Sequence, residues 1–255
     1  MISKPRIGII IPIIQKKYIK NIISSIFETN NRKDLLVCVV NDGNRKINNY
    51  VNKLRTHNIE IINLKNNSCF AGANNAGWKY LINKFSSIDY LGSINDDTIP
   101  NNNWLNELVL CLDKNESVGA CGPIMQSGSG FFKKNISNSA TWKLNNIEQP
   151  MVIEHNKITT DEFVSVLGGF CFLAKKNALE QIDFFDERFK NSCEDIDLSL
   201  KLLKVGWNIK VCSKSIVYHK CGKSRFKSNT NTNIKFSRQL LAEKWGRDLT
   251  KYNLK

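Results

Sequence analysis

Two kinds of hydrophobic pattern alternate along the first hundred residues of the chain. One is a continuous apolar run, typical of a strand buried on both faces of a sheet. The other is an apolar residue every three or four positions, typical of a helix with one buried face. The continuous runs predict strands at 6–14, 34–40, 59–64 and 88–94, and the periodic stretches predict helices at 19–27, at 47–54 and from about 69 toward 85.

This alternation of strand and helix predicts an α/β fold whose parallel sheet carries helices on both faces. In such sheets ligands bind beyond the carboxyl ends of the strands. Acidic residues follow two of the expected strands: Asp42 stands in Asn41-Asp42-Gly43, and Asp96 and Asp97 follow the strand at 88–94. We therefore expect the three carboxylates to surround one crevice.

The second half of the chain is less regular, and residues 126–160 are polar and mixed. That stretch predicts either a small antiparallel piece or a mobile lid. Without repeats or a clear linker, we expect one domain at 1–225, with two lobes that divide near residue 98. A basic helical tail is expected at 226–255. Further elements are predicted as a helix at 104–112, a strand at 118–123, a strand–turn–strand–helix unit at 163–182, a helix at 194–207 ending at Gly206, a final strand or two at 207–222, and an amphipathic helix at 236–245.

Charge and cysteine content narrow the class of protein. The 37 Lys and Arg exceed the 23 Asp and Glu, so the net charge of +14 favours a polyanionic partner such as nucleic acid, an anionic membrane surface or a phosphorylated small molecule. The eight cysteines form no C-x-x-C pair, so we expect reduced, buried thiols rather than a zinc site or disulfides. The apolar N-terminal run is too short to span a bilayer and contains Pro12, so a cytoplasmic protein is expected.

The adjacent acids Asp96 and Asp97 are the first candidate site. Burying two like charges is costly unless a cation or hydrogen-bond donors compensate them. Aspartate oxygens suit Mg²⁺ or Mn²⁺, which also bind diphosphate oxygens. The alternative is a solvated turn in which Asp97 or Thr98 caps a helix that begins near Pro100.

Four other features each have a structural and a functional interpretation. Asp42 precedes Gly43, and the pair is either a tight turn with Gly43 at positive φ or an acceptor for a base N–H. The small-residue stretch 66–78 is either a closely packed helix or a helix start that binds phosphate. The acids at 194–197 are either first-turn charges or include a general base. His219 is either structural or completes a Mn²⁺ site.

Taken in order, these pieces resemble a known family. The strand containing Pro12 is followed by NDG, NNSCFAGANNAG, INDDT, LGGFCFLAKKNALEQIDFFDERF, EDIDLSLKLLKVGW and VYHKCGKS. This series is similar to the inverting glycosyltransferases of family 2, which have the GT-A fold, and most of all to their rhamnosyltransferase-like branch. The resemblance extends over residues 5–225. The chain differs from the family after Pro12, where an aromatic residue and Asn are common, and residues 126–160 match no family pattern.

The resemblance implies the GT-A fold, a Rossmann-like, mostly parallel sheet flanked by helices with a smaller acceptor-side lobe. In the domain at 1–225 it implies a nucleotide-sugar-binding half at 1–98 and an acceptor and catalytic half at 99–225. It also implies a role for each candidate residue. Pro12 and Asp42 would line the nucleotide base, the Ala73–Asn74 region would close over it, and Asp96 would face the ribose. Asp97 and His219 would hold the metal. Gly168, Gly169 and Phe170 would shape the acceptor side, and Asp195 would be the general base with Glu194 beside it.

The activity implied is a metal-dependent, inverting glycosyltransferase that uses Mn²⁺ or Mg²⁺ and a nucleoside-diphosphate sugar. Its acceptor would be a glycan or lipid-linked hydroxyl in polysaccharide synthesis, at the inner face of a membrane. The basic tail either docks on that membrane or is a helix that packs on the protein. Nucleic acid is not an expected partner. One rival is a nucleotidyltransferase, but QKKYIKN after the first strand lacks the glycines of a triphosphate loop. A non-enzymatic nucleic-acid binder would explain the charge but not the acids.

Overall fold

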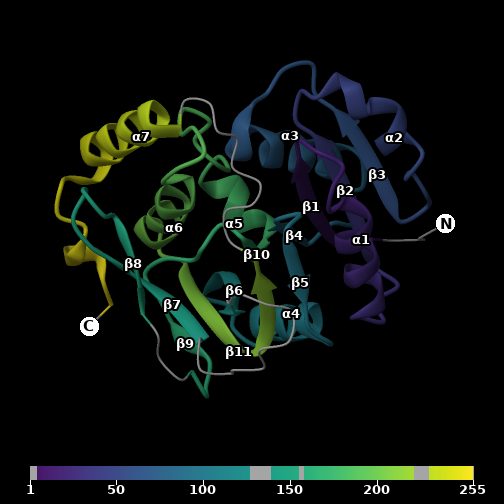
Figure 1. Cartoon of the computed structure of the whole chain (residues 1–255). Coiled ribbons are helices and arrows are strands. Elements are labelled where there is room, and N and C mark those ends of the chain that lie inside the picture. Colours follow the sequence, from purple (N-terminus) through teal and green to yellow (C-terminus); the bar gives the residue numbers. More distant parts are fainter. Residues whose placement is uncertain (1–4, 127–138, 155–157, 221–229, 255) are drawn as a thin grey trace.

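Helices cover both faces of a mixed β-sheet in the computed structural model, which describes residues 5–126, 139–154, 158–220 and 230–254 (Figure 1). The strands are β1 (Ile7–Ile13), β2 (Leu35–Asn41), β3 (Ile59–Asn63), β4 (Tyr90–Ile94), β5 (Thr98–Pro100), β6 (Val118–Gln126), β7 (Ser139–Leu144), β8 (Met151–Glu154), β9 (Glu162–Phe163), β10 (Cys171–Lys175) and β11 (Asn208–His219). The α-helices are α1 (Ile19–Glu28), α2 (Asn48–Asn52), α3 (Cys69–Lys84), α4 (Trp104–Asp113), α5 (Lys176–Gln181), α6 (Glu194–Lys204) and α7 (Thr230–Trp245).

The first four strands form a parallel sheet in the order β3–β2–β1–β4, which confirms the arrangement expected from the alternating pattern. Successive side chains of a strand point to opposite faces. In β1, Ile9 and Ile11 enter one hydrophobic core while Ile10, between them, enters the other. A continuous apolar run is therefore required here, because helices cover both faces of the sheet. Helices α1, α2 and α4 pack into the first core, and α3 and α5 into the second.

Beyond β4 the sheet is mixed. Strand β10 lies antiparallel between β4 and β6, β11 runs parallel to β6, and β5 pairs antiparallel with the end of β11. In this last pair His219 lies opposite Thr98, the residue that follows Asp97. The β5–β11 pair therefore brings together two candidate residues that are far apart in the sequence.

The capping alternative for the acid pair is wrong. Residues Thr98–Pro100 form β5, and α4 begins only at Trp104, where Asn103 adopts a left-handed conformation with φ 63°. The Thr98 hydroxyl donates to the Asn95 carbonyl oxygen instead of a helix. The backbone of this short segment is satisfied by pairing with β11, a long-range contact that local turn chemistry does not reveal.

The turn glycines Gly43 and Gly206 have φ values of 80° and 93°, as expected from their places after β2 and α6. Within 126–160, β7 and β8 form an antiparallel pair, which confirms the small antiparallel piece. Residues 127–138 and 155–157 of that stretch, where a lid was the alternative, lie outside the described residues.

Helix α7 is the expected tail helix and begins before its predicted start. Leu240, Leu241 and Trp245 are buried in the same core that holds β1 and α6, and Figure 1 shows α7 beside α6. One side of the tail therefore packs on the domain, while the division of the chain at 225 stays a prediction. Among the helices of the described ranges, none has the length and hydropathy needed to cross a bilayer.

Candidate active site

Asp97 and His219 meet at the carboxyl end of β4. The Asp97 side chain is only 1% exposed, and its Oδ1 lies 3.2 Å from His219 Nε2. Neither carboxylate oxygen accepts a hydrogen bond from the described part of the chain. Buried carboxylate oxygens are almost always satisfied, so this pair has the chemistry of an incomplete cation site. Oxygen from Asp97 and nitrogen from His219 suit a transition ion such as Mn²⁺ better than Mg²⁺, which prefers oxygen alone.

The imidazole of His219 is held in place by the segment that precedes β10. Its ring stacks on Phe170, with centroids 5.2 Å apart and planes at 16°. The Phe170 carbonyl oxygen accepts the Asn95 N–H at 2.8 Å, and Asn95 Nδ2 lies 3.5 Å from His219 Nε2. The orientation of the candidate metal ligand is therefore fixed by residues on both sides of it.

Asp96 is also buried, at 6% exposure. Burial and the neighbouring charge of Asp97 raise the pKa of Asp96 to about 7, although His219 opposes this shift. A nearby divalent cation would favour the ionised carboxylate. Asp96 also lines a cavity of about 340 Å³ between α1 and β5, to which Tyr18 and Lys220 contribute. A cavity of about 450 Å³ between α3 and the segment before α6 contains none of the candidate residues.

Asp195 and Glu194 form the start of α6. Asp195 is half-buried, and its Oδ2 accepts the Gly169 N–H at 2.9 Å. A Cβ on Gly169 would lie 3.4 Å from that same oxygen, so a glycine there permits the loop to approach the carboxylate closely. Because Phe170 follows Gly169 in the chain, the segment Gly168–Phe170 connects Asp195 to His219. The structure therefore brings the candidate base and the candidate metal ligand to one loop.

Gly168 occupies the other side of this loop. A Cβ on Gly168 would lie 2.8 Å from the ring of Trp142 in β7, and the Trp142 and Phe170 rings are 5.6 Å apart. The antiparallel piece therefore packs directly on the segment assigned to the acceptor side. Sequence reasoning missed Trp142 because residues 126–160 match no recognised pattern.

Asp197, the third acid of the cluster, has a structural environment. Its side chain is fully buried; Oδ1 accepts a hydrogen bond from Trp245 Nε1 at 2.8 Å and forms an ion pair with Lys244 Nζ at 2.6 Å. This geometry supports the choice of Asp195 over Asp197 as the candidate base, since the two acids point to different neighbours.

Asp42 connects β2 to the start of α3. Its Oδ1 accepts the backbone N–H of Ser68 at 2.6 Å and the Ser68 hydroxyl at 2.8 Å. Burial raises the pKa of Asp42, and the Ser68 hydrogen bonds oppose this rise. Pro12, half-buried, lies at the end of the adjacent strand β1, opposite Val40. The contacts of Pro12 and Asp42 with a nucleotide base stay predictions, and Ser68 is a site neighbour that no sequence pattern indicated.

Ala73 and Asn74 lie inside the protein rather than at the crevice surface. Both are fully buried: Ala73 belongs to a hydrophobic core, and Asn74 Nδ2 donates to the Phe70 carbonyl oxygen. The structure therefore shows the closely packed helix that was one alternative for this stretch. Closure of Ala73 and Asn74 over a base stays a prediction, and it requires the start of α3 to move.

Three thiols from separate elements also lie together. The sulfur atoms of Cys111, Cys121 and Cys212 are all within 4.8 Å of one another and buried between α4, β6 and β11. All three side chains belong to the first hydrophobic core, and the Cys121 thiol donates to the Leu108 carbonyl oxygen at 3.3 Å. We therefore assign the cluster to the core. All described cysteines are free, as expected, and the cluster was missed because its members are not spaced as a local motif.

Comparison with solved structures shows the same fold in several glycosyltransferases. GalNAc-T7 with UDP, GalNAc and Mn²⁺ gives a TM-score of 0.68 at 13% identity over 86% of this chain and 44% of the other. S. aureus TarS 1–349 with UDP-GlcNAc gives 0.64 at 16% over 96% and 68%. The mannosyltransferase PcManGT of Pyrobaculum calidifontis with GDP-Man and Mn²⁺ gives 0.60 at 16% over 87% and 58%. These likenesses establish the GT-A fold.

Sequence comparison identifies the family. An N-acetylglucosaminyl-diphospho-decaprenol L-rhamnosyltransferase of Mycobacterium tuberculosis (strain CDC 1551 / Oshkosh) is 40% identical over 58 residues, which are 22% of this chain and 19% of that protein. The chain thus matches about a fifth of the length of this relative. The model of glycosyl transferase family 2 matches residues 8–183, more than half of the chain. This chain therefore belongs to glycosyltransferase family 2.

Proposed function

We propose that this glycosyltransferase is metal-dependent and inverting, and that it moves a sugar from a nucleoside-diphosphate sugar to an acceptor hydroxyl. One observation carries the proposal. The two buried carboxylate oxygens of Asp97 accept no hydrogen bond from the described residues and lie beside His219, at the loop that also contacts Asp195. Structural neighbours that contain Mn²⁺ with UDP or with GDP-mannose support the same assignment.

In the proposed reaction, Asp195 accepts the proton of the acceptor hydroxyl as that oxygen attacks the anomeric carbon. The nucleoside diphosphate leaves from the opposite side, so a single displacement inverts the anomeric configuration. Asp97 and His219 would hold the divalent ion, which would supply charge stabilisation for the leaving diphosphate. Gly169 fixes the Asp195 carboxylate through its N–H, which orients the base before the acceptor arrives.

The finer assignment is a rhamnosyl or other hexosyl donor and a glycan or lipid-linked acceptor in polysaccharide synthesis. The support is the short match to a rhamnosyltransferase whose name contains a decaprenol diphosphate acceptor. The excess of basic residues, 37 against 23 acidic, suits an anionic donor and an anionic acceptor.

We expect the purified protein to hydrolyse one nucleotide sugar of a panel slowly when Mn²⁺ is present, because water can replace the absent acceptor. The panel should contain UDP-, GDP- and dTDP-linked sugars, and the released nucleoside diphosphate should be measured by chromatography. The same reaction in excess chelator is the control. No release from any donor, together with no calorimetric binding of UDP, GDP or dTDP in Mn²⁺, would contradict the proposed function.

We also propose peripheral contact with an anionic membrane through α7, in a protein that works at the cytoplasmic face. While Leu241 is buried, Lys235 and Phe236 on the same helix are exposed, Phe236 at 52%. An exposed aromatic residue beside a cation is a common interfacial contact. The protein should sediment with phosphatidylglycerol vesicles and not with phosphatidylcholine vesicles, and Phe236→Ser should weaken this binding. Equal sedimentation with both vesicles, or with neither, would rule the contact out.

A further inference from the structure

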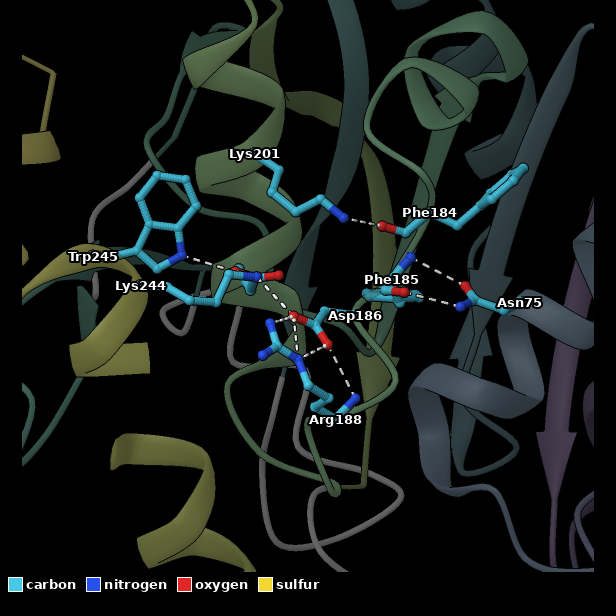
Figure 2. A network of polar contacts seen from close by, with 9 residues as sticks. Asn75, Phe184, Phe185, Asp186, Arg188, Lys201, Lys244 and Trp245 are labelled. Carbon is cyan, nitrogen blue, oxygen red and sulfur yellow. Dashed lines mark hydrogen bonds and ion pairs between the residues drawn. The ribbon is translucent and has the colours of Figure 1, made fainter. Parts of the chain in front are cut away.

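Helix α7 contacts the segment Asp186–Asp197 at both of its ends. Lys244 Nζ lies 2.9 Å from Asp186 Oδ2 and 2.6 Å from Asp197 Oδ1, so one ammonium group joins the first and last residues of the segment. The same ammonium lies 5.4 Å from the centroid of the Phe189 ring. Figure 2 shows Lys244 reaching toward Asp186, next to Arg188. Since the Lys244 side chain is 23% exposed and Asp197 is 1% exposed, these contacts are largely shielded from solvent.

Two further contacts from α7 reach the same segment. Trp245 donates its Nε1–H to Asp197 Oδ1 at 2.8 Å, and the hydroxyl of Ser237 accepts the Lys190 backbone N–H at 3.2 Å. Ser237 and Asp197 are both fully buried. The segment is therefore fixed at its start, middle and end by a single helix.

The segment needs such support because its backbone is unfavourable by itself. Asn191 and Cys193 both have positive φ values, 57° and 67°, in a region that residues other than glycine rarely occupy. Cys193 is also the N-cap of α6, and its side chain makes no capping hydrogen bond. On the side away from α7, Asn191 Oδ1 accepts the Phe70 N–H at 3.0 Å. Contacts from outside the segment thus keep this turn in place.

The turn at Cys193 sets the position of Asp195. Asp195 follows two residues later, and Asp197 lies in the same first turn of α6. Asp195 Oδ2 reaches the Gly169 N–H at 2.9 Å, a contact that a shift of the helix start would break. A misplacement of about 1 Å can reduce a reaction about 10²-fold. Small movements at Asp197 are therefore expected to matter for the base.

We propose that Lys244 and Trp245 are positioning residues for sugar transfer: by holding both ends of Asp186–Asp197 they place Asp195 for proton abstraction. This inference rests on the proposed function, because it assigns the base to Asp195. The Lys244 and Trp245 side chains act through Asp197 and touch neither donor nor acceptor. They would set the rate of the chemical step and leave donor affinity unchanged.

The test compares Lys244→Met with Lys244→Arg, which keeps the charge, and with Lys114→Met, a matched change at an exposed lysine that ends helix α4. Lys244→Met should lower kcat by about 10-fold to 10²-fold. Here kcat is calculated only for the protein molecules that bind the nucleoside diphosphate, so that unfolded protein does not count. The donor KM and the Kd of the nucleoside diphosphate in Mn²⁺ should not change. Lys244→Arg should recover most of the rate, and Lys114→Met should match the wild type. Trp245→Phe, which removes only the N–H donor, is the milder variant if Lys244→Met does not fold.

Hydrogen exchange of the same proteins, followed by mass spectrometry, tests whether Lys244 and Trp245 hold the segment in place, and this measurement does not depend on catalysis. Amides of 187–197 should exchange faster in Lys244→Met or Trp245→Phe, while those of β1 and β2 do not change. Faster exchange with an unaltered kcat would overturn the positioning role, and so would unaltered exchange with an unaltered kcat. If the total rate of transfer falls only in proportion to the number of molecules that bind the nucleoside diphosphate, the contact is merely structural. That outcome would also overturn the positioning role. If the wild type transfers no sugar, the proposed function fails, and so does the catalytic part of this inference, while exchange still shows whether α7 holds the segment.

Discussion

Replacing Asp195 by Asn should lower sugar transfer about 10²–10⁴-fold, the usual contribution of a general base. The amide keeps the shape of the side chain and an oxygen for the Gly169 N–H, but it cannot take up the acceptor proton. Donor binding should change little, because the acid contacts the loop rather than the strand ends where the diphosphate is proposed to bind. The measurement is kcat for transfer beside calorimetric binding of the nucleoside diphosphate.

A matched control for Asp195→Asn is Glu107→Gln, which also removes an acid from the first turn of a helix, in this case α4. Loss of favourable charge at a helix start would affect both variants alike, whereas only Asp195→Asn should slow transfer. Transfer at nearly the wild-type rate would exclude Asp195 as the base. A loss of donor affinity instead would make Asp195 a binding residue, and Glu194→Gln would then be the variant to measure.

The second large effect is expected from Asp97→Ala, which should abolish transfer and weaken nucleoside diphosphate binding in Mn²⁺. A metal ion at a leaving diphosphate contributes several kcal/mol to the transition state, which corresponds to about 10³-fold or more in rate. His219→Ala should have a smaller effect and raise the Mn²⁺ concentration needed for half-maximal activity, since it would remove one of the two proposed protein ligands. Both variants are tested by titrating Mn²⁺ into transfer assays.

Stability separates this loss of activity from a loss of folding. In the metal-free protein Asp97 is a buried acid whose oxygens accept no hydrogen bond from the described residues, and His219 at 3.2 Å offsets the cost of burying it only when the imidazole is protonated. Asp97→Ala should therefore melt at or above the wild-type temperature in chelator while it fails to transfer sugar. Full activity of the wild type in excess chelator would contradict a metal role for Asp97.

The parallel half of the fold and the place of its acids could be predicted from the sequence because both follow from local pattern. A continuous apolar run such as 6–14 requires burial on two faces, and a topological rule then brings Asp42 and Asp97 to the same edge. The family resemblance added the roles of Asp195 and His219. The roles stay proposals; the structure shows that Asp195 contacts Gly169 and that His219 stacks on Phe170.

The features that escaped prediction depend on long-range pairing. β5 has only three residues and exists because β11 pairs with it. Ser68 meets Asp42 across 26 positions of sequence, and Lys244 meets Asp186 across 58. None of these pairs leaves a periodic signal. For Ala73 and Asn74 the sequence left a closely packed helix and a ligand contact open; both side chains are buried in the packed helix, and their contact with a base stays a prediction.

The ribosome synthesises the β5–β11 pair and helix α7 in a particular order, and this order determines when the site is complete. Strands β1 to β4 are parallel neighbours and can form as soon as they emerge, in line with the N-terminal-first folding of nascent chains. His219 and Lys244 are translated long after Asp97 and Asp195, which they contact or position. A nascent chain that ends before them therefore has its acids at the strand ends but neither the proposed second metal ligand nor the proposed support of the base. Catalytic competence would arise late in synthesis, after the crevice itself has formed.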